Sequence, residues 1–437
     1  MCETTIKVSN GDTFIGGSLT RYFENWKDLE VSPTILDWIE NGVSIPNANC
    51  IPTFEQNNRK FNLKETYFLR SEIKDLLKSQ CIEKCDQRPK CVSPLTVVPK
   101  KGGKQFRLVL DLRLVNSYST PPSFVHEDID TVRGLCTPKA NLVTVDLKSG
   151  FHNLSVNKSS RDLLGFKFEG TYYRFTTLVF GLSWSPYIFS KTVRCVVRHL
   201  RGKGLRLVAY VDDFCIIDSP ENIESARDTV IDTLQRLGFY INFEKSSLQP
   251  DTRKQYIGYI IDTSKSDNSV WIEIPPQRIR TVKHDITRAL RKGHILARGL
   301  ARIAGQLVSM SKAIVPTKLL LRNIYRLLST KKTWSDILVL DIHSINDLEW
   351  WHNNLNSWNG KFLQLTDDLE CVQLATDASK LAWGGHILNS NLKCQGYWST
   401  HVRHQSSNYR EMGAVLNSLL SFTNRLKGKK SRFCPTI

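Results

Sequence analysis

The chain has 437 residues, a length that typically divides into two to four domains. Its 60 Lys and Arg residues exceed its 42 Asp and Glu residues, so the formal net charge is +18. Hydrophobic residues make up 41% of the chain and aromatic residues 10%, which is enough for large cores and excludes wholesale disorder. The excess of positive charge favours a polyanionic partner, either a nucleic acid or an anionic membrane surface.

The sequence gives little support to a membrane partner. It has no run of about 18 uncharged apolar residues, so no spanning helix is expected, and its first residues, MCETTIKVSNGDTF, lack the apolar segment of a signal peptide. Eleven cysteines are an odd number and are sparse for this length, which predicts reduced thiols. We therefore expect an intracellular protein of the cytoplasm and/or the nucleus.

Hydrophobic periodicity and turn signals predict helices and strands in alternation along the chain. Helices are predicted over residues 61–90 and 222–237, and a further helix is predicted to begin at Ser185 and Pro186. The predicted strands cover residues 95–99, 106–110, 143–147 and 255–261. Gly102 and Gly103 separate the first two strands and predict a hairpin. A separate α/β segment begins at Leu374.

The positive charge is concentrated between Gln277 and Thr333. This segment contains fourteen Lys and Arg residues and a single acid, Asp285, so it carries +13 of the +18. Its apolar residues recur at helical spacing, which predicts two or three amphipathic helices with basic outer faces. An ordinary solvated helix would mix both signs of charge, so we interpret the segment as a surface for nucleic-acid phosphates.

The strongest chemical signal is a pair of adjacent acids, Asp212 and Asp213, between two β-prone apolar runs. Such a pair indicates the tip of a hairpin, and two neighbouring carboxylates are costly to desolvate unless a cation lies between them. Mg²⁺ prefers oxygen ligands of this kind, and Asp146, at the end of another short strand, is a candidate third ligand. Taken alone, the pair is better explained as an exposed turn.

The surrounding motifs decide between these two interpretations, because six of them, in the same order, resemble the polymerase core of reverse transcriptases. They are Phe106 to Asn116, Asp146-Leu147-Lys148-Ser149-Gly150-Phe151, Val179 to Pro186, Tyr210-Val211-Asp212-Asp213, Leu237 to Ser246, and Tyr256-Ile257-Gly258-Tyr259. The resemblance implies an α+β fold of the right-hand polymerase type, with fingers, palm and thumb. It also implies an RNA-directed DNA polymerase that uses two Mg²⁺ ions, or Mn²⁺, to transfer a nucleotide from a dNTP to a primer 3′-OH.

Two further resemblances extend the comparison along the chain. Thr376-Asp377-Ala378-Ser379 and Asn408-Tyr409-Arg410-Glu411 are similar to the start of a ribonuclease H domain. The segments Gly16 to Leu19, Phe23 to Trp26 and Gly396 to Ser399 look closest to DIRS-type retrotransposons, which pair this polymerase with a tyrosine recombinase. The expected organisation is therefore an N-terminal extension (1–60), fingers and palm (61–262), thumb (263–335), a tether (336–370) and a partial ribonuclease H-like domain (371–437).

The resemblance assigns roles to individual residues. The expected catalytic and metal-binding residues are Asp146, Asp212 and Asp213; the nucleotide-binding residues are Lys100, Lys101, Arg107, Phe151 and Lys245; the primer- and template-binding residues are Tyr256, Gly258, Arg291, Arg298 and Arg302. Phe151 would block a ribose 2′-OH, and Lys245 would serve the leaving pyrophosphate. Phe180 departs from retroviral enzymes, which carry Gln at this place. The expected partners are an RNA template, a DNA primer, an RNA–DNA hybrid, dNTPs and, where the element encodes it, a recombinase.

The ribonuclease H-like segment lacks part of its expected chemistry. Asp377 and Glu411 match the first two of four carboxylates, and no Asp or Glu follows Glu411. We therefore expect a truncated, vestigial domain without ribonuclease H activity. Two alternatives to the leading hypothesis remain. One is a non-catalytic remnant that binds primer–template through its basic segment; the other is a group-II-intron-like or telomerase-like enzyme, against which the ribonuclease H-like segment argues.

Overall fold

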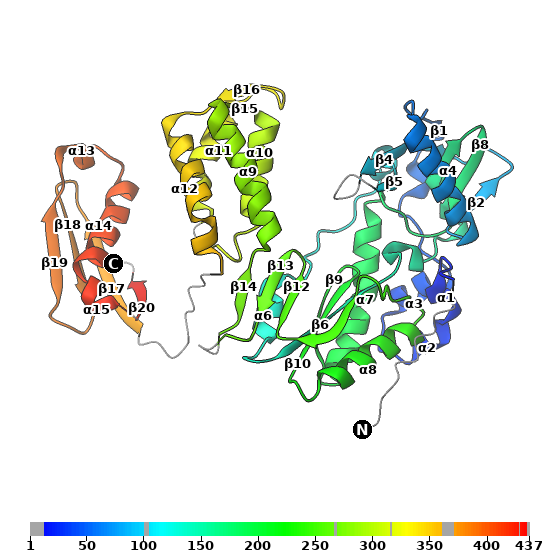
Figure 1. Cartoon of the computed structure of the whole chain (residues 1–437), viewed down its shortest axis with the longest axis horizontal. Helices are drawn as coiled ribbons and strands as arrows, with labels where there is room; N and C mark the ends of the chain where they lie inside the picture. The colour runs from blue at the N-terminus through cyan, green and yellow to red at the C-terminus, as the bar shows by residue number, and fades with distance from the viewer. Residues whose placement is uncertain are drawn as a thin grey trace. The chain divides into compact units, whose positions relative to one another are not determined.

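The computed structural model describes residues 13–99, 105–265, 269–314, 317–360, 371–427 and 429–434. The chain divides into two compact units, Met1–Phe362 and Leu363–Ile437, and each is described by itself. Figure 1 gives the order of the elements from the N-terminus to the C-terminus. Among the described helices, none combines the length and the apolar character needed to cross a membrane.

The first described elements of the larger unit belong to its main core. They are α1 (Ser18–Arg21), α2 (Phe23–Lys27), α3 (Pro33–Glu40) and the 3₁₀ helix η1 (Ala48–Cys50). Trp26 is fully buried against Phe239, and its indole Nε1 donates to the main-chain oxygen of Leu237 at 3.0 Å. The segment that we expected to be an extension, residues 1–60, is thus in its described part built into the body of the protein.

The fingers follow, built on a five-stranded sheet in the order β1-β3-β7-β8-β2. Its strands are β1 (Phe54–Glu55), β2 (Ile82–Cys85), β3 (Cys91–Val92), β7 (Gly165–Phe168) and β8 (Thr171–Phe175), and nearby lie η2 (Gly150–Asn153) and η3 (Lys158–Leu164). The helix α4 (Leu63–Lys78) begins with a reciprocal capping box between Asn62 and Glu65. The hairpin β4 (Leu95–Pro99) and β5 (Phe106–Leu110) forms over the strands predicted from the sequence.

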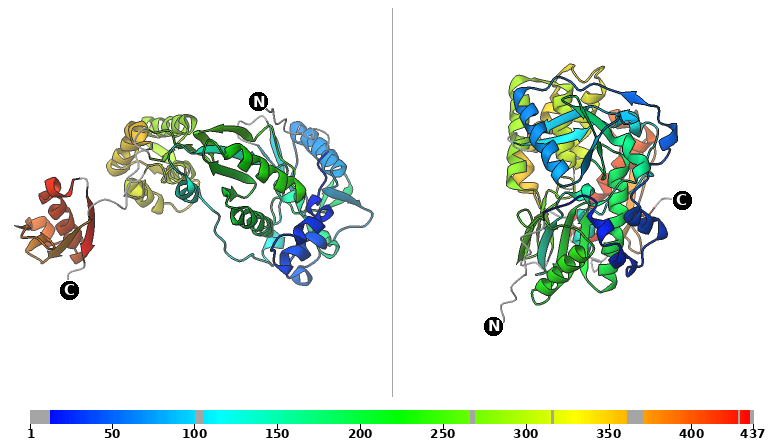
Figure 2. Two further views of the ribbon diagram at one scale, coloured as in Figure 1. Left: turned by 90° about the horizontal axis from the view of Figure 1, so that it is seen from below. Right: turned by 90° about the vertical axis from the view of Figure 1, so that its right-hand side faces the viewer.

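The palm is a four-stranded antiparallel sheet in the order β11-β6-β10-β9. Its elements are β6 (Asn141–Asp146), β9 (Arg206–Tyr210), β10 (Asp213–Asp218), β11 (Ser247–Asp251), α5 (Arg113–Asn116), α6 (Ile129–Leu135), α7 (Trp184–Gly202) and α8 (Ile223–Arg236). Strand alternation sends Val145 and Phe214 into the core that contains α7 and α8, and Leu142 and Cys215 into a second core on the other face. Figure 2 shows the palm helices beside the sheet from two directions.

The second core continues through a three-stranded sheet into a helical thumb. The elements are β12 (Arg253–Tyr256), β13 (Tyr259–Asp262), β14 (Trp271–Glu273), α9 (Pro276–Lys292), β15 (His294–Leu296), α10 (Ala297–Val308), η5 (Leu319–Leu321), α11 (Arg322–Ser329), β16 (Ile337–Val339) and α12 (Ile342–Trp358). We expected a tether over residues 336–370, but α12 packs on α9 and buries Leu348, Trp351 and Leu355 in this core. The thumb therefore extends through Trp358.

The smaller unit is a mixed sheet with helices. The strands β17 (Cys371–Ala378), β18 (Ala382–Ile387), β19 (Lys393–Tyr397) and β20 (Lys430–Cys434) pair in the order β19-β18-β17-β20, and the helices are α13 (Thr400–Arg403), α14 (Ser407–Ser421) and α15 (Thr423–Leu426). The pair β17–β20 is parallel, and α14 packs against β17 and β18. Asp377 lies on β17 and Glu411 on α14; their assignment as ribonuclease H residues stays a prediction.

Candidate active site

The acidic pair lies at the tip of the hairpin formed by β9 and β10, as the sequence predicts. Asp213 is directly opposite Tyr210 on β9 and directly opposite Asp146 on β6. Val211 and Asp212 form the two-residue turn, and the main-chain N–H of Leu147 donates to the main-chain oxygen of Asp212 at 2.9 Å. Antiparallel pairing thus brings together three carboxylates that are up to 67 positions apart in the sequence, counted from Asp146 to Asp213.

The neighbourhood of these acids is electrostatically unfavourable without a cation. Burial, together with the carboxylates of Asp212 and Asp146, raises the pKa of Asp213 to about 7, and burial also raises the pKa of Asp212. Within the described residues, Asp146 Oδ1 is buried and has no hydrogen-bond partner; the nearest cation is the Lys245 ammonium, 3.9 Å away. A buried acceptor of this kind is suited to a cationic ligand.

The donor set fits a hard cation such as Mg²⁺, which takes oxygen ligands. Across the described ranges, however, no group of three or more His, Cys, Asp or Glu side chains is gathered closely enough to hold a metal by itself. Mg²⁺ is usually bound by one or two carboxylates with substrate phosphates and waters completing its shell. The carboxylates present therefore fit a metal that is shared with a phosphate-bearing substrate.

A cleft of about 750 Å³ opens beside the acidic hairpin. Arg107 from β5, Phe180 from the loop before α7, and Asp212 and Lys245 from the palm all line it. The Arg107 guanidinium lies over the Phe180 ring, 5.2 Å from its centroid, which leaves its donors free to face the cleft. Gly150 also lines the cleft, and a Cβ there would come within 3.3 Å of Asp212 Oδ2 at a φ of +30°. Lys100 and Lys101 lie outside the described residues.

Phe151 does not line this cleft. It is 8% exposed, and its ring packs at 4.8 Å from the Phe180 ring and at 5.6 Å from the Phe189 ring. The aromatic side chain at the cleft wall is Phe180, which the sequence marked only as a departure from retroviral enzymes. Phe151 thus packs against Phe180, and its direct contact with the ribose stays a prediction.

Tyr256 also lies differently from our expectation of a primer contact. Its side chain is 3% exposed, and its hydroxyl donates to the main-chain oxygen of Asp213 at 2.9 Å. The next two residues, Ile257 and Gly258, both have positive φ, as in a type I′ hairpin turn. Arg278 Nη1 donates to the main-chain oxygen of Gly258 at 2.5 Å, which joins this turn to α9.

The basic thumb residues divide into two groups. Some have partners within the protein: Arg302 pairs with Asp285 at 3.0 Å, Arg326 with Asp341 at 2.9 Å, and Lys312 with Asp130. Others have no acidic partner in the described part of the chain, and the exposed ones on the outer face of α9 are Arg280, Arg288, Arg291 and Lys292. Arg298, at the start of α10, is likewise exposed and without an acidic partner among the described residues.

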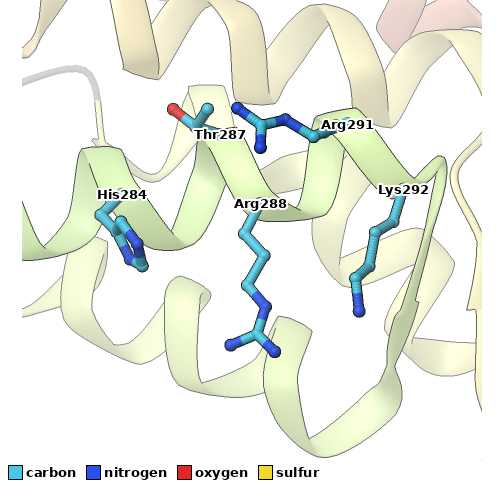
Figure 3. A pocket seen from close by; sticks show the side chains of 5 residues that line it. All are labelled: His284, Thr287, Arg288, Arg291 and Lys292. Atoms are coloured by element: carbon cyan, nitrogen blue, oxygen red, sulfur yellow. The ribbon is translucent and has the colours of Figure 1, made fainter.

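Figure 3 shows the C-terminal half of this α9 face, where five side chains line a shallow pocket of about 340 Å³. His284, Arg288 and Lys292 are spaced four residues apart and project to one side of the helix, while Thr287 and Arg291 lie along the neighbouring row. Of the three arginines predicted from the sequence, Arg291 and Arg298 are thus exposed without an acidic partner among the described residues, and Arg302 pairs with Asp285. Arg288 and Lys292 share the exposed, unpaired state of Arg291 in the described part of the chain.

An antiparallel palm sheet with acids on its two central strands, flanked by fingers and a thumb, defines a right-hand polymerase fold. Comparison with known proteins agrees. Residues 98–261 match the family model described as "Reverse transcriptase (RNA-dependent DNA polymerase)", so the chain contains a reverse transcriptase domain.

Relatives from transposable elements match part of the chain. The chain is 29% identical over 196 residues to the "Retrovirus-related Pol polyprotein from transposon opus" and 30% identical over 224 residues to that from transposon gypsy, both of Drosophila melanogaster. These alignments cover 44% and 49% of this chain but only 18% and 20% of the relatives, so the chain corresponds to about a fifth of their length.

Solved structures support the fold over almost the whole chain. A foamy viral protease-reverse transcriptase in complex with double-stranded DNA is 16% identical, with a TM-score of 0.65, over 99% of this chain and 77% of that chain. A foamy viral protease-reverse transcriptase in complex with an RNA/DNA hybrid is also 16% identical, with a TM-score of 0.63, over 98% of this chain and 58% of that chain. At this identity the likeness concerns the fold alone.

Proposed function

We propose that the chain is an RNA-directed DNA polymerase that adds nucleotides from dNTPs to the 3′-OH of a primer. One observation carries the proposal: Asp213 lies directly opposite Asp146 on the two central palm strands, with Asp212 at the adjoining turn and lining a cleft that also contains Arg107 and Lys245. Asp212 thus shares the cleft with Arg107 and Lys245, two cations whose chemistry suits phosphate. The reverse transcriptase domain at residues 98–261 includes all three acids.

The acids would hold two Mg²⁺ ions, or Mn²⁺, together with the triphosphate of the substrate. When bound, such ions neutralise charge on the reacting phosphate and favour the deprotonated primer hydroxyl. Asp146 has an unpartnered buried oxygen for this purpose, and Asp212 and Asp213 supply the neighbouring donors. The described residues therefore contribute carboxylates, and the substrate contributes the remaining oxygen ligands.

The cations of the cleft bind and orient the nucleotide. Arg107 presents a planar fork of N–H donors suited to two phosphate oxygens, and the Phe180 ring holds the guanidinium in place. Lys245 is 71% exposed and reaches toward the acids, where its ammonium can donate to the departing pyrophosphate. Phe180 also lines the cleft, so its side chain would limit the space available to the nucleotide.

We extend the proposal to partners and origin. An RNA template, a DNA primer and their hybrid fit the unpaired positive charge of α9, and the foamy viral relatives were solved with duplex DNA and with an RNA/DNA hybrid. The N-terminal and Gly396 to Ser399 motifs support a DIRS-type retrotransposon as the source, with an element-encoded recombinase as a further partner. An intracellular location, in the cytoplasm and/or the nucleus, accords with this origin.

The test is primer extension on a poly(rA) template with an oligo(dT) primer, dTTP and Mg²⁺. Substitution Asp212→Asn or Asp146→Asn should lower the extension rate by about 100-fold or more, because a charge that acts on the reacting phosphate is lost. Hybrid binding should stay within about twofold, since the α9 surface is untouched. Asp218→Asn is the matched control: this acid ends the same strand β10 and pairs with Arg206 at 3.1 Å.

The non-catalytic alternative predicts a different outcome. Tight binding of the RNA–DNA hybrid by the unmodified chain, with no extension at any Mg²⁺ or Mn²⁺ concentration, would reject the polymerase and favour a binding remnant. Equal losses in Asp212→Asn and Asp218→Asn would show that the extension depends on the stability of β10 and not on the acids.

A further inference from the structure

The hairpin that carries the acids, residues 206–218, contains a strained turn. Val211 has a φ of +57°, although it is β-branched and not glycine. A Cβ-branched side chain is strongly disfavoured in this region, and such conformations persist only where surrounding contacts hold them. The position of Asp212 and Asp213 therefore depends on the contacts that restrain the hairpin from outside its own turn.

The structure shows two such contacts at the tip. One is the bond from the Leu147 N–H to the main-chain oxygen of Asp212, which comes from the strand that bears Asp146. The other is the bond from the Tyr256 hydroxyl to the main-chain oxygen of Asp213. The same hydroxyl lies 3.4 Å from the main-chain oxygen of Val208, so it touches both strands of the hairpin.

Tyr256 is itself held rigidly. Its side chain is almost completely buried in the second core, and it is the last residue of β12 before the turn at Ile257 and Gly258. That turn is bound to α9 through Arg278, whose second Nη donates to Ser309 Oγ at 2.6 Å. The hydroxyl thus joins the acidic hairpin to a turn that the thumb helix holds.

We propose that Tyr256 is a positioning residue for the polymerase reaction: its hydroxyl fixes the acidic hairpin in the conformation that places Asp213 opposite Asp146 and Asp212 at the adjoining turn. The inference rests on the proposed polymerase function and gives Tyr256 a role distinct from the primer contact that the sequence predicted. The hydroxyl bonds to the main chain of Asp213 itself, so its loss acts directly on the residue that lies opposite Asp146. The position of the bond predicts an effect on turnover and not on substrate binding.

The test compares Tyr256→Phe with Thr263→Val. The first removes one oxygen and keeps the ring. The control also removes a fully buried hydroxyl, which donates at 2.5 Å to the main-chain oxygen of Ala140. Ala140 directly precedes β6, at the end of this strand that is remote from Asp146. Both substitutions should lower the melting temperature to a similar extent, because each deletes buried hydroxyl hydrogen bonds to main-chain oxygens.

Four quantities are measured on each variant of the full chain: kcat and KM for dTTP, the Kd for the hybrid, and amide hydrogen exchange in peptides covering residues 206–218. For Tyr256→Phe we expect kcat to fall about fivefold, which corresponds to one net hydrogen bond, with KM and Kd within about twofold. Exchange in the hairpin should quicken by a similar factor. Thr263→Val should leave kcat and hairpin exchange as in the unmodified chain.

Other outcomes overturn the inference. Unchanged kcat and unchanged hairpin exchange in Tyr256→Phe would show that the hydroxyl positions nothing, and equal losses of kcat in both variants would reveal a general effect of stability. If the unmodified chain extends no primer, the proposed polymerase function is refuted, but the role of Tyr256 in holding the hairpin is not. In that case the exchange comparison still decides whether Tyr256 holds the hairpin.

Discussion

Charge on the outer face of α9 should set the salt dependence of hybrid binding. Arg288, Arg291 and Lys292 are exposed and lack acidic partners among the described residues, so each is free to displace a counterion from a phosphate. Each such contact contributes about 0.9 to the slope of log K against log salt. Replacing all three with Ala should therefore reduce the slope by about 2.7. Between about 50 and 200 mM salt, these contacts account for about a 40-fold change in affinity.

Fluorescence anisotropy of a labelled RNA–DNA hybrid, measured across this salt range, gives the slope for the unmodified chain and for the triple variant. Arg302→Ala is the control, because Arg302 lies on the neighbouring helix and is already paired with Asp285 at 3.0 Å. It should leave the slope nearly unchanged, although it removes one positive charge, as each of the three α9 substitutions does. Parallel lines for the triple variant and the unmodified chain, or an equal change in Arg302→Ala, would refute the assignment of α9 as the phosphate-contacting face.

Three further outcomes follow from buried or cleft-lining side chains. Trp26→Ala should lower the free energy of unfolding by about 3–5 kcal/mol in chemical denaturation, because it empties a fully buried site; a loss below about 1 kcal/mol would contradict that packing. Burial lowers the pKa of His152 to about 4 from 6.5, so the unfolded chain binds the extra proton between these values and stability falls as the pH drops through this window. This contribution of His152 should approach about 3 kcal/mol at pH 4, and the difference between the unmodified chain and His152→Gln, each denatured at pH 7 and at pH 4, isolates it. An equal loss in both chains would contradict it. Arg107→Ala should raise the KM for dTTP about tenfold and leave the hybrid affinity unchanged. Arg107→Lys should recover only part of this loss, because lysine lacks the planar fork of donors. An unchanged KM in Arg107→Ala would exclude Arg107 from nucleotide binding.

The hairpin that carries Asp212 and Asp213 was predictable because its determinants are local, whereas its assignment as a metal site rested on the resemblance of six ordered motifs. Alternating apolar residues on both sides of Asp212 and Asp213 indicate a hairpin, and a short strand ending in Asp146 is a natural neighbour. The hairpin of β4 and β5 was predictable for the same reason, since the turn glycines separate two β-prone runs. In each case, residues close together in the sequence decide the conformation.

Features that depend on distant partners were not predictable. Arg302 and Arg291 look alike in the sequence, and only the tertiary pairing with Asp285 separates them. The role of Tyr256 depends on the main chain of a residue 43 positions away. Likewise, α12 carries an apolar pattern that could have been recognised as core-forming, but its packing partner α9 lies more than 50 residues earlier.

The bond between Trp26 and Leu237 spans 211 positions of the chain, and it has a consequence for synthesis on the ribosome. At about 5–20 residues per second, roughly 10–40 seconds pass between the emergence of the indole and that of its partner. During this interval the N-terminal helices have no palm against which to bury their apolar faces. The apolar faces of a nascent chain of this protein therefore stay without their final partner for that period, and slow translation would lengthen it.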